Sequence, residues 1–193
     1  AKNLLTLKQI HSSKVITIKG GTNSNMIEGD GMVTTEKGVS LGVLTADCAP
    51  ILFYDPKNKI IGCAHSGWKG SFNGVVKNTI KKFKDLNSNT DDLIAVVGPC
   101  IDMKNYIVQI DFVKKFINKN KKNDTFLKKI DDEKYIFDLR GFINKELVNL
   151  NVKNIENIEM DTFSNKDFFY SYRRSRLNKE IDYGRCISVI LMT

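Results

Sequence analysis

Two histidines and a cysteine form the most chemically suggestive set in this sequence. His11 and His65 are the only histidines, and the Thr-Ala-Asp-Cys segment that ends at Cys48 lies between them. Two imidazoles and a thiolate are a ligand set for zinc that leaves one tetrahedral position open for water or substrate. Each residue adjoins a strand-like run that ends at a loop, where functional sites are usually built. We therefore predict that folding joins the three in a catalytic metal site.

Zinc and copper are the two metals that this ligand set suggests. A zinc ion would hold Cys48 as a thiolate and lower the pKa of a bound water toward neutrality. Blue-copper sites also use two histidines and a cysteine, usually with an axial methionine. No methionine lies near His65 in the sequence, so zinc is preferred and copper is the less favoured alternative.

Four neighbouring residues have both a structural and a functional interpretation. If residues 45–48 are extended, Asp47 and Cys48 point to opposite faces; if a turn intervenes, Asp47 could orient the site or act as a general base. Trp68 is either a buried anchor or a stacking wall for a flat ligand. Asp30, between two glycines, suits a turn. Cys100 could be a nucleophile, but no third histidine exists to serve as its base.

Arginine and lysine are distributed differently along the chain. The net charge is +8, from 30 basic and 22 acidic residues, and many lysines follow polar helix faces, as Lys77 and Lys81 do. A solvated surface explains them better than nucleic-acid binding does. Arginine, whose planar fork suits phosphate and carboxylate, is concentrated near the C-terminus. The clustered arginines are Arg173, Arg174, Arg176 and Arg185.

Hydrophobic periodicity predicts a mixture of strands and helices without strict alternation. This favours an α+β fold, a layered sandwich of mixed β-sheets flanked by helices. Residues 22–30 are expected to form a loop. Strands are predicted at 13–18, 39–45, 51–54, 59–65, 93–98, 106–110, 155–160 and 186–192, the last of them central because it is almost wholly apolar. Helices are predicted at 71–86, 111–119 and 139–150, with Asp138 as the N-cap of the third.

Length and composition place the chain among ordinary globular proteins. At 193 residues with 41% hydrophobic and 27% charged residues, one domain spanning 1–193 is the expectation. No apolar run approaches the ~20 residues of a membrane helix, and the first residues do not form a signal peptide. A cytoplasmic protein without a membrane partner, monomeric or homodimeric, is therefore expected. Cys63 and Cys186 lie in apolar runs and are expected to be buried thiols.

Six blocks of sequence, in this order, resemble the YfiH-like family, also called the laccase-domain family. The resemblance extends from about residue 9 to the C-terminus. The Thr-Ala-Asp-Cys and Ala-His-x-Gly-Trp-Lys-Gly blocks are highly specific in combination. The blocks are Gln9-Ile10-His11, Gly29-Asp30-Gly31-Met32-Val33-Thr34, Leu44-Thr45-Ala46-Asp47-Cys48-Ala49-Pro50, Ala64-His65-Ser66-Gly67-Trp68-Lys69-Gly70, Val97-Gly98-Pro99-Cys100-Ile101, and Phe169-Tyr170-Ser171-Tyr172-Arg173-Arg174 with Gly184-Arg185.

The resemblance implies a zinc site made of His11, Cys48 and His65, and a layered α/β sandwich. It also implies phosphorolysis of adenosine, inosine and methylthioadenosine to base plus ribose 1-phosphate, together with adenosine deamination. Purine nucleoside and phosphate are then the partners. For catalysis we assign Asp47, Cys48, Arg173 and Arg174; for substrate binding we assign Gln9, Trp68, Tyr172 and Arg185.

Two departures from the family pattern bear on specificity. Only eight residues precede Gln9, so the usual N-terminal segment of the family is expected to be lacking. The family's Tyr-Glu-Val after Gly-Pro-Cys-Ile reads Tyr106-Ile107-Val108 here. A copper-dependent polyphenol oxidase (a laccase) and a catalytically silent ligand-binding homologue are the alternatives to the nucleoside phosphorylase.

Overall fold

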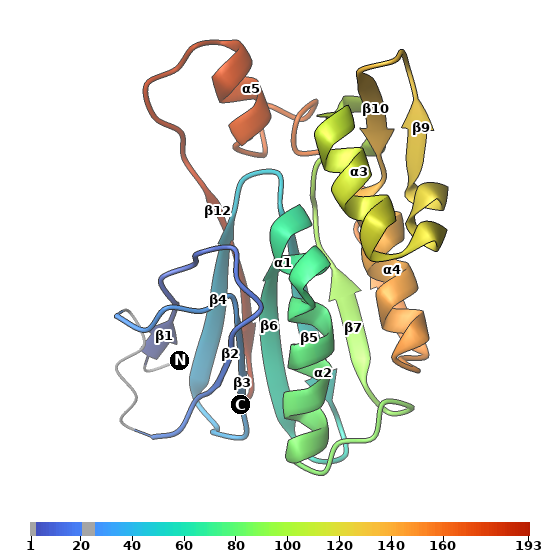
Figure 1. The fold of residues 1–193 in the computed structure, drawn as a ribbon. Helices are drawn as coiled ribbons and strands as arrows, with labels where there is room; N and C mark the ends of the chain where they lie inside the picture. The colour runs from blue at the N-terminus through green and yellow to red at the C-terminus, as the bar shows by residue number, and fades with distance from the viewer. Residues whose placement is uncertain (1–2, 21–25) are drawn as a thin grey trace.

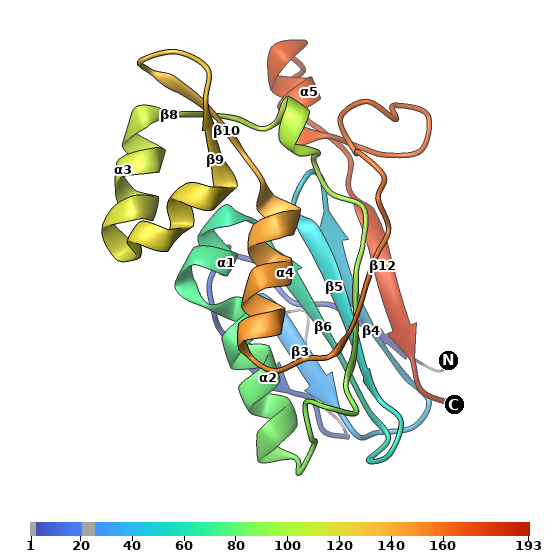
Figure 2. The same cartoon turned by 90° about the vertical axis from the view of Figure 1, so that its right-hand side faces the viewer.

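The fold is a sandwich of three layers: a small sheet, a large sheet and a set of helices. The computed structural model describes residues 3–20 and 26–193. The loop expected over 22–30 therefore lies partly outside the described residues. In Figure 2 the helices α1, α2 and α4 stand on one side of the large sheet, and β4 and β12 stand on the other. This arrangement confirms the predicted α+β sandwich of mixed sheets.

The large sheet forms the middle layer. Its strand order is β11-β7-β5-β6-β3-β2, with parallel and antiparallel neighbours. The strands predicted at 51–54 and 59–65 form a hairpin at its centre, because β5 pairs with β6 around the turn that begins at Asp55. All seven residues of β6 are buried, as expected for a strand covered on both faces. The strands are β2 (Val15–Thr17), β3 (Gly31–Thr34), β5 (Ala49–Asp55), β6 (Ile60–Ser66), β7 (Ile94–Val97) and β11 (Asn154–Asn157).

Three helices cover one face of the large sheet: α1 (Trp68–Asn73), α2 (Val75–Asp85) and α4 (Leu139–Asn149). The prediction of a single helix over 71–86 is wrong, because two helices, α1 and α2, share this stretch. Gly74 has φ +91°, a left-handed conformation that ends α1 and begins α2. The helix predicted at 139–150 is present as α4. Its N-cap is Asp138, as predicted, because the Asp138 carboxylate accepts the backbone N–H of Gly141. Buried side chains of α2 and α4 pack on this face of the sheet and form the larger of two apolar cores.

The small sheet covers the opposite face and encloses the second core. It comprises β1 (Asn3–Leu5), β4 (Val39–Thr45) and β12 (Cys186–Leu191), with β4 in the middle. The prediction that 186–192 forms a central strand is wrong. Within residues 3–20 and 26–193, β12 pairs only with β4, and Ile187, Val189 and Leu191 on its outer face are about 40% exposed. An apolar composition indicated burial on two faces, but the inner face of this strand is half-buried and its outer face is exposed.

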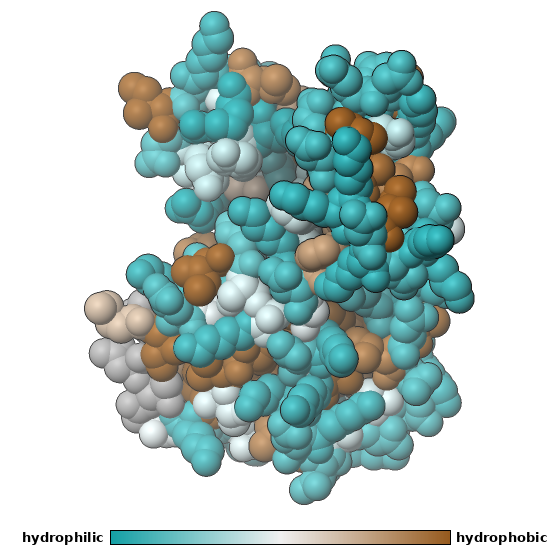
Figure 3. Space-filling view, viewed as in Figure 1, coloured by the Kyte–Doolittle hydropathy of each residue, from teal (hydrophilic) through white to brown (hydrophobic). Residues whose placement is uncertain are grey.

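The remaining elements lie beyond the ends of the central strands (Figure 1). A three-stranded sheet, β8 (Ile107–Gln109), β10 (Lys134–Phe137) and β9 (Leu127–Lys129), packs with α3 (Ile110–Lys119). Stacked and edge-on contacts among Phe112, Phe116 and Phe137 hold α3 to this sheet. The short helix α5 (Tyr172–Leu177) lies in the connection that leads to β12. Most of the face shown in Figure 3 is hydrophilic, and it is hollowed between the lobes that carry α5 and α3.

Several smaller expectations can be compared with the structure. All four cysteines are free. Cys63 is fully buried, as predicted, whereas Cys186 is only half-buried. In the described part of the chain, no helix combines the length and the apolar character that crossing a membrane requires.

Candidate metal centre and adjoining cavity

The structure brings His11, Cys48 and His65 together, as the sequence predicted. Their candidate ligand atoms all lie within 4.8 Å of one another. The Cys48 Sγ is 3.9 Å from the His11 Nε2, and the two imidazole rings meet edge to face with centroids 4.7 Å apart. Tetrahedral zinc, with bonds of about 2.0–2.3 Å, places its ligand atoms about 3.5 Å apart. The donor set and its spacing therefore fit a metal ion.

Three different elements supply the three ligands. Cys48 immediately precedes β5, and His65 lies on β6 opposite Pro50, so the central hairpin brings these two side chains together. His11 lies in the loop that precedes β2, with a left-handed φ of +58°. The glycine that follows the second histidine makes room for the thiol, since a Cβ on Gly67 would lie 2.4 Å from the Cys48 Sγ. Any side chain at Gly67 would displace the sulfur.

Asp30 is a residue of this site that the sequence interpretation missed. Its carboxylate is 1% exposed and accepts a 2.9 Å hydrogen bond from Nδ1 of His65. It also accepts the backbone N–H groups of Ile10, His11 and Ser12. The Gly-Asp-Gly pattern predicted a turn and gave no sign of these partners. The Asp30–Gly31 segment pairs alongside His65, which the register of β3 and β6 would have shown.

The pKa values of Asp30, Cys48 and His65 reflect the contacts of these side chains with one another and with their neighbours. Burial by itself would raise the pKa of Asp30, but hydrogen bonds from His65 and Ser12 outweigh it and lower the pKa to about 2. Burial would also raise the pKa of the Cys48 thiol, yet both histidines lower it to about 7. Burial would lower the pKa of His65, whereas Asp30 and Cys48 raise it to about 9. The cluster thus favours a thiolate, the form that binds metal.

Asp47 lies beside Cys48 in sequence but faces another part of the molecule. Its φ of +80° shows that a turn separates the two residues, rather than an extended chain. The carboxylate is 8% exposed and accepts hydrogen bonds from the hydroxyls of Thr162 and Ser171 and from the backbone N–H of Arg173. These bonds favour a structural role over proton transfer, because they attach the loop after β4 to the segment before α5 and to the first turn of α5.

The metal cluster opens into a cavity of about 650 Å³, within the range typical of small-molecule sites. Apolar and aromatic side chains form most of its wall, and two cations, Lys69 and Arg173, lie at its border. Trp68 is half-buried and contacts Phe112 edge to face, at a centroid distance of 5.0 Å. It is thus both a packing residue and part of the cavity wall. A flat, largely apolar ligand suits this cavity.

A smaller cavity of about 210 Å³ adjoins the cluster on another side. His11 and Cys48 line both cavities, while His65 and the predicted binding residues Gln9 and Arg185 line only the smaller one. Gln9 is occupied by structure, because its side-chain amide donates to and accepts from the backbone of Leu44. Arg185 is exposed and lies over a tyrosine ring. The cluster therefore separates a large apolar cavity from a small polar one.

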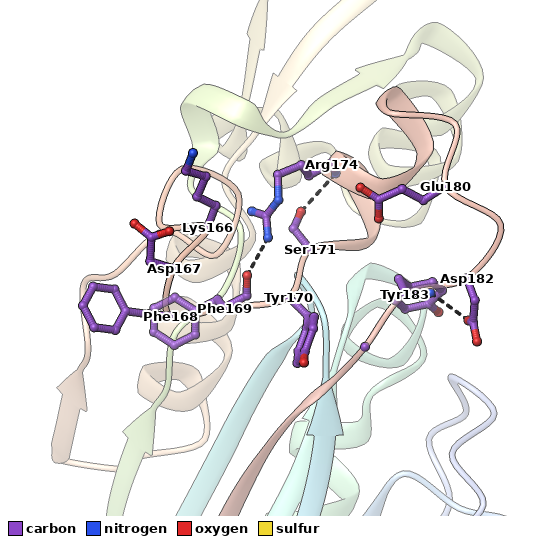
Figure 4. Close-up of a pocket in the computed structure, with 11 residues that line it drawn as sticks. Lys166, Asp167, Phe168, Phe169, Tyr170, Ser171, Arg174, Glu180, Asp182 and Tyr183 are labelled. Atoms are coloured by element: carbon purple, nitrogen blue, oxygen red, sulfur yellow. Dashed lines mark hydrogen bonds between the residues drawn. The ribbon is translucent and has the colours of Figure 1, made fainter.

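The structure does not bring Arg174 to either of these cavities. Its guanidinium donates to the backbone carbonyls of Thr162, Phe163 and Phe169, and it lines a separate cavity of about 570 Å³ beneath α5. Figure 4 shows the bond to the Phe169 carbonyl. Arg173, by contrast, borders the large cavity and donates to the Ile107 carbonyl. Adjacent arginines thus point into different parts of the molecule.

Tyr183 is a second wall residue that the sequence interpretation missed. It lines all three cavities and contacts the predicted binding residue Tyr172 edge to face at 5.1 Å. The guanidinium of Arg176 lies 5.9 Å from its ring centroid, and that of Arg185 lies 4.8 Å from it. A lone tyrosine in a polar segment gave no sequence signal. The catalytic and binding roles assigned to these side chains remain predictions.

Comparison with known proteins shows the family of this chain. A family model described as multi-copper polyphenol oxidoreductase laccase matches residues 1–193. The chain belongs to this family. A relative from Rickettsia conorii, called a purine nucleoside phosphorylase, is 36% identical over 193 residues, which are 100% of this chain and 79% of the relative. The YfiH protein of Escherichia coli, also called a purine nucleoside phosphorylase, is 28% identical over 88% of this chain and 68% of its own length.

Solved structures of the family show the same fold. The crystal structure of a Bacillus licheniformis protein called YfiH superposes with a TM-score of 0.90 at 27% identity, covering 98% of this chain and 74% of that one. A Neisseria meningitidis protein superposes with a TM-score of 0.87 at 28% identity, covering 98% and 75%. The recognition of a YfiH-like, laccase-domain protein from the sequence blocks is therefore confirmed.

Proposed function

We propose that this protein is a zinc-dependent purine nucleoside phosphorylase that cleaves adenosine, inosine and methylthioadenosine, and that it also deaminates adenosine. The observation that carries the proposal is the His11–Cys48–His65 cluster, two of whose residues, His11 and Cys48, line a large, mostly apolar cavity. Relatives called purine nucleoside phosphorylases support the reaction class. Purine nucleoside and phosphate are the proposed partners.

The cavity offers one wall for the base. The aromatic rings of Trp68, Tyr172 and Tyr183 border it, and a purine stacked against them would be shielded from water. Holding the base there would place the ribose near His11 and Cys48, the two ligands that line both cavities. The small polar cavity then remains available on the other side of the cluster for a second, charged reactant.

Phosphate needs cations whose hydrogen-bond donors are not all engaged by the protein. Arg173 at the border of the large cavity and Arg185 at the small one are the candidates, whereas Arg174 is engaged by three carbonyls. In phosphorolysis a phosphate oxygen bonds to C1′ of the ribose as the bond from C1′ to the purine nitrogen breaks. The electron pair leaves with the base, which takes up a proton. Arg185 would hold and orient a phosphate bound in the small cavity, and Arg173 would do so for one bound at the border of the large cavity.

The metal ligands leave few groups for proton transfer. His11 and His65 are both committed to the cluster, and the Asp47 carboxylate already accepts three hydrogen bonds. When bound, zinc supplies a Lewis acid and lowers the pKa of water, which is the chemistry that deamination of adenosine requires. The protein side chains would bind and orient the nucleoside and exclude bulk water.

Product analysis tests the proposal directly. Incubation of the pure, zinc-loaded protein with inosine and phosphate should yield hypoxanthine and ribose 1-phosphate in equal amounts. Adenosine without phosphate should yield inosine. Absence of both reactions at full zinc occupancy would refute the enzyme and favour a ligand-binding homologue.

A copper-dependent polyphenol oxidase is the second candidate, because the family model carries that description. The ligand set argues against several copper ions. The sequence has two histidines, and in the described part of the chain a single group of His, Cys, Asp or Glu side chains is close enough to hold a metal. Metal analysis together with dioxygen uptake on a phenolic substrate separates the two functions. Zinc content without oxygen uptake would exclude the oxidase.

A further inference from the structure

We infer that Asp30 is the positioning residue of the metal centre, and that one of its oxygens orients both histidine ligands. The inference rests on the metal ligation within the proposed function but not on the reaction catalysed. Asp30 is not itself a member of the ligand cluster. It acts through His11 and His65, which approach it from segments 19 and 35 residues away along the chain.

The two carboxylate oxygens of Asp30 have different partners. Oδ1 accepts the backbone N–H of His11 at 3.0 Å and the ring Nδ1 of His65 at 2.9 Å. Oδ2 accepts the backbone N–H of Ser12 at 2.6 Å, its hydroxyl at 2.7 Å and the backbone N–H of Ile10 at 3.3 Å. Oδ1 therefore contacts the two metal-ligand residues, and Oδ2 contacts the loop around them.

The bond to His65 determines which ring nitrogen faces the metal. An ionised carboxylate only accepts hydrogen bonds, so the Nδ1 of His65 must carry a proton. The other nitrogen, Nε2, is then the one left to bind a metal, on the side where Cys48 lies. Carboxylate–histidine pairs of this kind fix the tautomer and orientation of metal ligands, and losing them typically costs about 10–100-fold in metal affinity.

The bonds to the loop hold His11 in an uncommon conformation. With φ at +58°, His11 is left-handed, a region that residues other than glycine enter seldom. Three successive backbone N–H groups, from Ile10 to Ser12, converge on the same carboxylate. This convergence curls the loop around Asp30 and turns the His11 ring toward the Cys48 Sγ, 3.9 Å away.

The substitution Asp30→Asn removes the negative charge and one acceptor oxygen of the side chain while keeping its size. Every partner of Asp30 is an N–H or O–H donor, so an amide group facing either side confronts donors with a donor. Asp55→Asn is the matched control, since Asp55 is also fully buried and accepts the N–H groups of Lys57 and Asn58 in the turn between β5 and β6. Ser12→Ala removes one bond to Oδ2 and leaves both bonds to Oδ1 in place.

Zinc affinity, measured by competition with a chelating dye, is the main readout. We expect Asp30→Asn to lower the affinity about 10–100-fold, and Asp55→Asn and Ser12→Ala to stay within about threefold of wild type. The thiolate-to-metal absorption band of the Co²⁺ form should shift in Asp30→Asn alone. Wild-type affinity in Asp30→Asn, or an equal loss in Asp55→Asn, would overturn the inference while leaving zinc ligation intact.

A measurement on the wild-type protein covers the case in which Asp30→Asn does not fold. Long-range ¹H–¹⁵N spectra of the zinc-loaded protein should show His65 protonated at Nδ1 and without a proton at Nε2. The opposite tautomer would overturn the inference. If zinc affinity falls in Asp30→Asn while the wild type releases no purine base from inosine, the phosphorylase proposal fails and the positioning role stands.

Discussion

Two buried carboxylates flank the metal cluster, and they hold together different parts of the molecule. Asp30 is 1% exposed and Asp47 is 8% exposed, and each accepts bonds from at least three donors. The donors to Asp30 belong to the ligand residues and their loop. Those to Asp47 come from residues 115 to 126 positions later, in the segment that leads into α5. One carboxylate therefore organises the metal site, and the other attaches the cavity wall.

This difference teaches that metal binding and cavity formation are separable in this fold. The hairpin β5–β6 and the strand β3 belong to the central sheet, so Cys48, His65 and Asp30 are held by the core. The wall residues Tyr172 and Tyr183 belong to the connection between β11 and β12, which lies outside the central sheet. A change at Asp30 should alter the metal first, and a change at Asp47 should alter the wall first.

Removal of the Cys48 thiolate should have the largest effect. Cys48→Ala deletes the only thiolate of the cluster, and two imidazoles alone do not form a zinc site of this type. We expect zinc, measured by mass spectrometry of the purified protein, to fall from about one equivalent to background, with loss of phosphorolysis. The half-buried Cys186, replaced by alanine, is the control and should keep its zinc. Equal zinc in wild type and Cys48→Ala would refute the cluster as the metal site.

The pH dependence of zinc affinity should come from the metal site that Asp30 organises and not from the cavity wall that Asp47 attaches. His65, with its pKa raised to about 9, and Cys48, with its pKa lowered to about 7, both carry protons that zinc must displace. Raising the pH removes these competitors, so affinity should rise about tenfold per unit between pH 7 and 9, and more steeply below pH 7. Chelator competition across pH 6–9 measures this slope, and a flat profile would contradict the proton linkage.

The same comparison shows what could be predicted from the sequence. The β5–β6 hairpin and the Asp138 cap were predictable because their signals are local: turn residues between apolar runs, and a carboxylate three residues before its donor. The bonds of Asp30 and Asp47 cross 18 to 126 residues and leave no local pattern. Arg173 and Arg174 were one feature in the sequence, but they are successive residues of α5, so their side chains leave the helix about 100° apart and reach different cavities.

The strand at 186–192 was mispredicted for a related reason. Its residues are apolar on both faces, which is typical of a central strand. Composition does not specify pairing partners, and β4 alone among the described strands pairs with it. The metal triad itself became predictable only through the blocks that surround it, since the intervals between His11, Cys48 and His65 carry no signature.

Asp47→Asn should destabilise the cavity wall and leave zinc binding unchanged. The amide would face the backbone N–H of Arg173 or the hydroxyl of Thr162 with a donor, so buried donors lose acceptors. We expect the free energy of unfolding to fall by about 2–3 kcal/mol, which lowers Tm by about 5–10 °C in a chain of this size. Calorimetry and limited proteolysis at 161–185 measure the change. Loss of zinc in this variant would show that the two carboxylates are not separable.

The smallest of these effects should come from the wall itself. Tyr183 packs against Tyr172 and lies between two guanidinium groups, so its ring rather than its hydroxyl makes the surface that a base would meet. A stacked base gains about 1–3 kcal/mol from an aromatic ring. Tyr183→Ala should therefore raise KM for inosine about tenfold with zinc content unchanged, and Tyr183→Phe should match wild type. An equal loss in both variants would assign the effect to the hydroxyl, and a loss of zinc would mean that wall and metal centre form one unit.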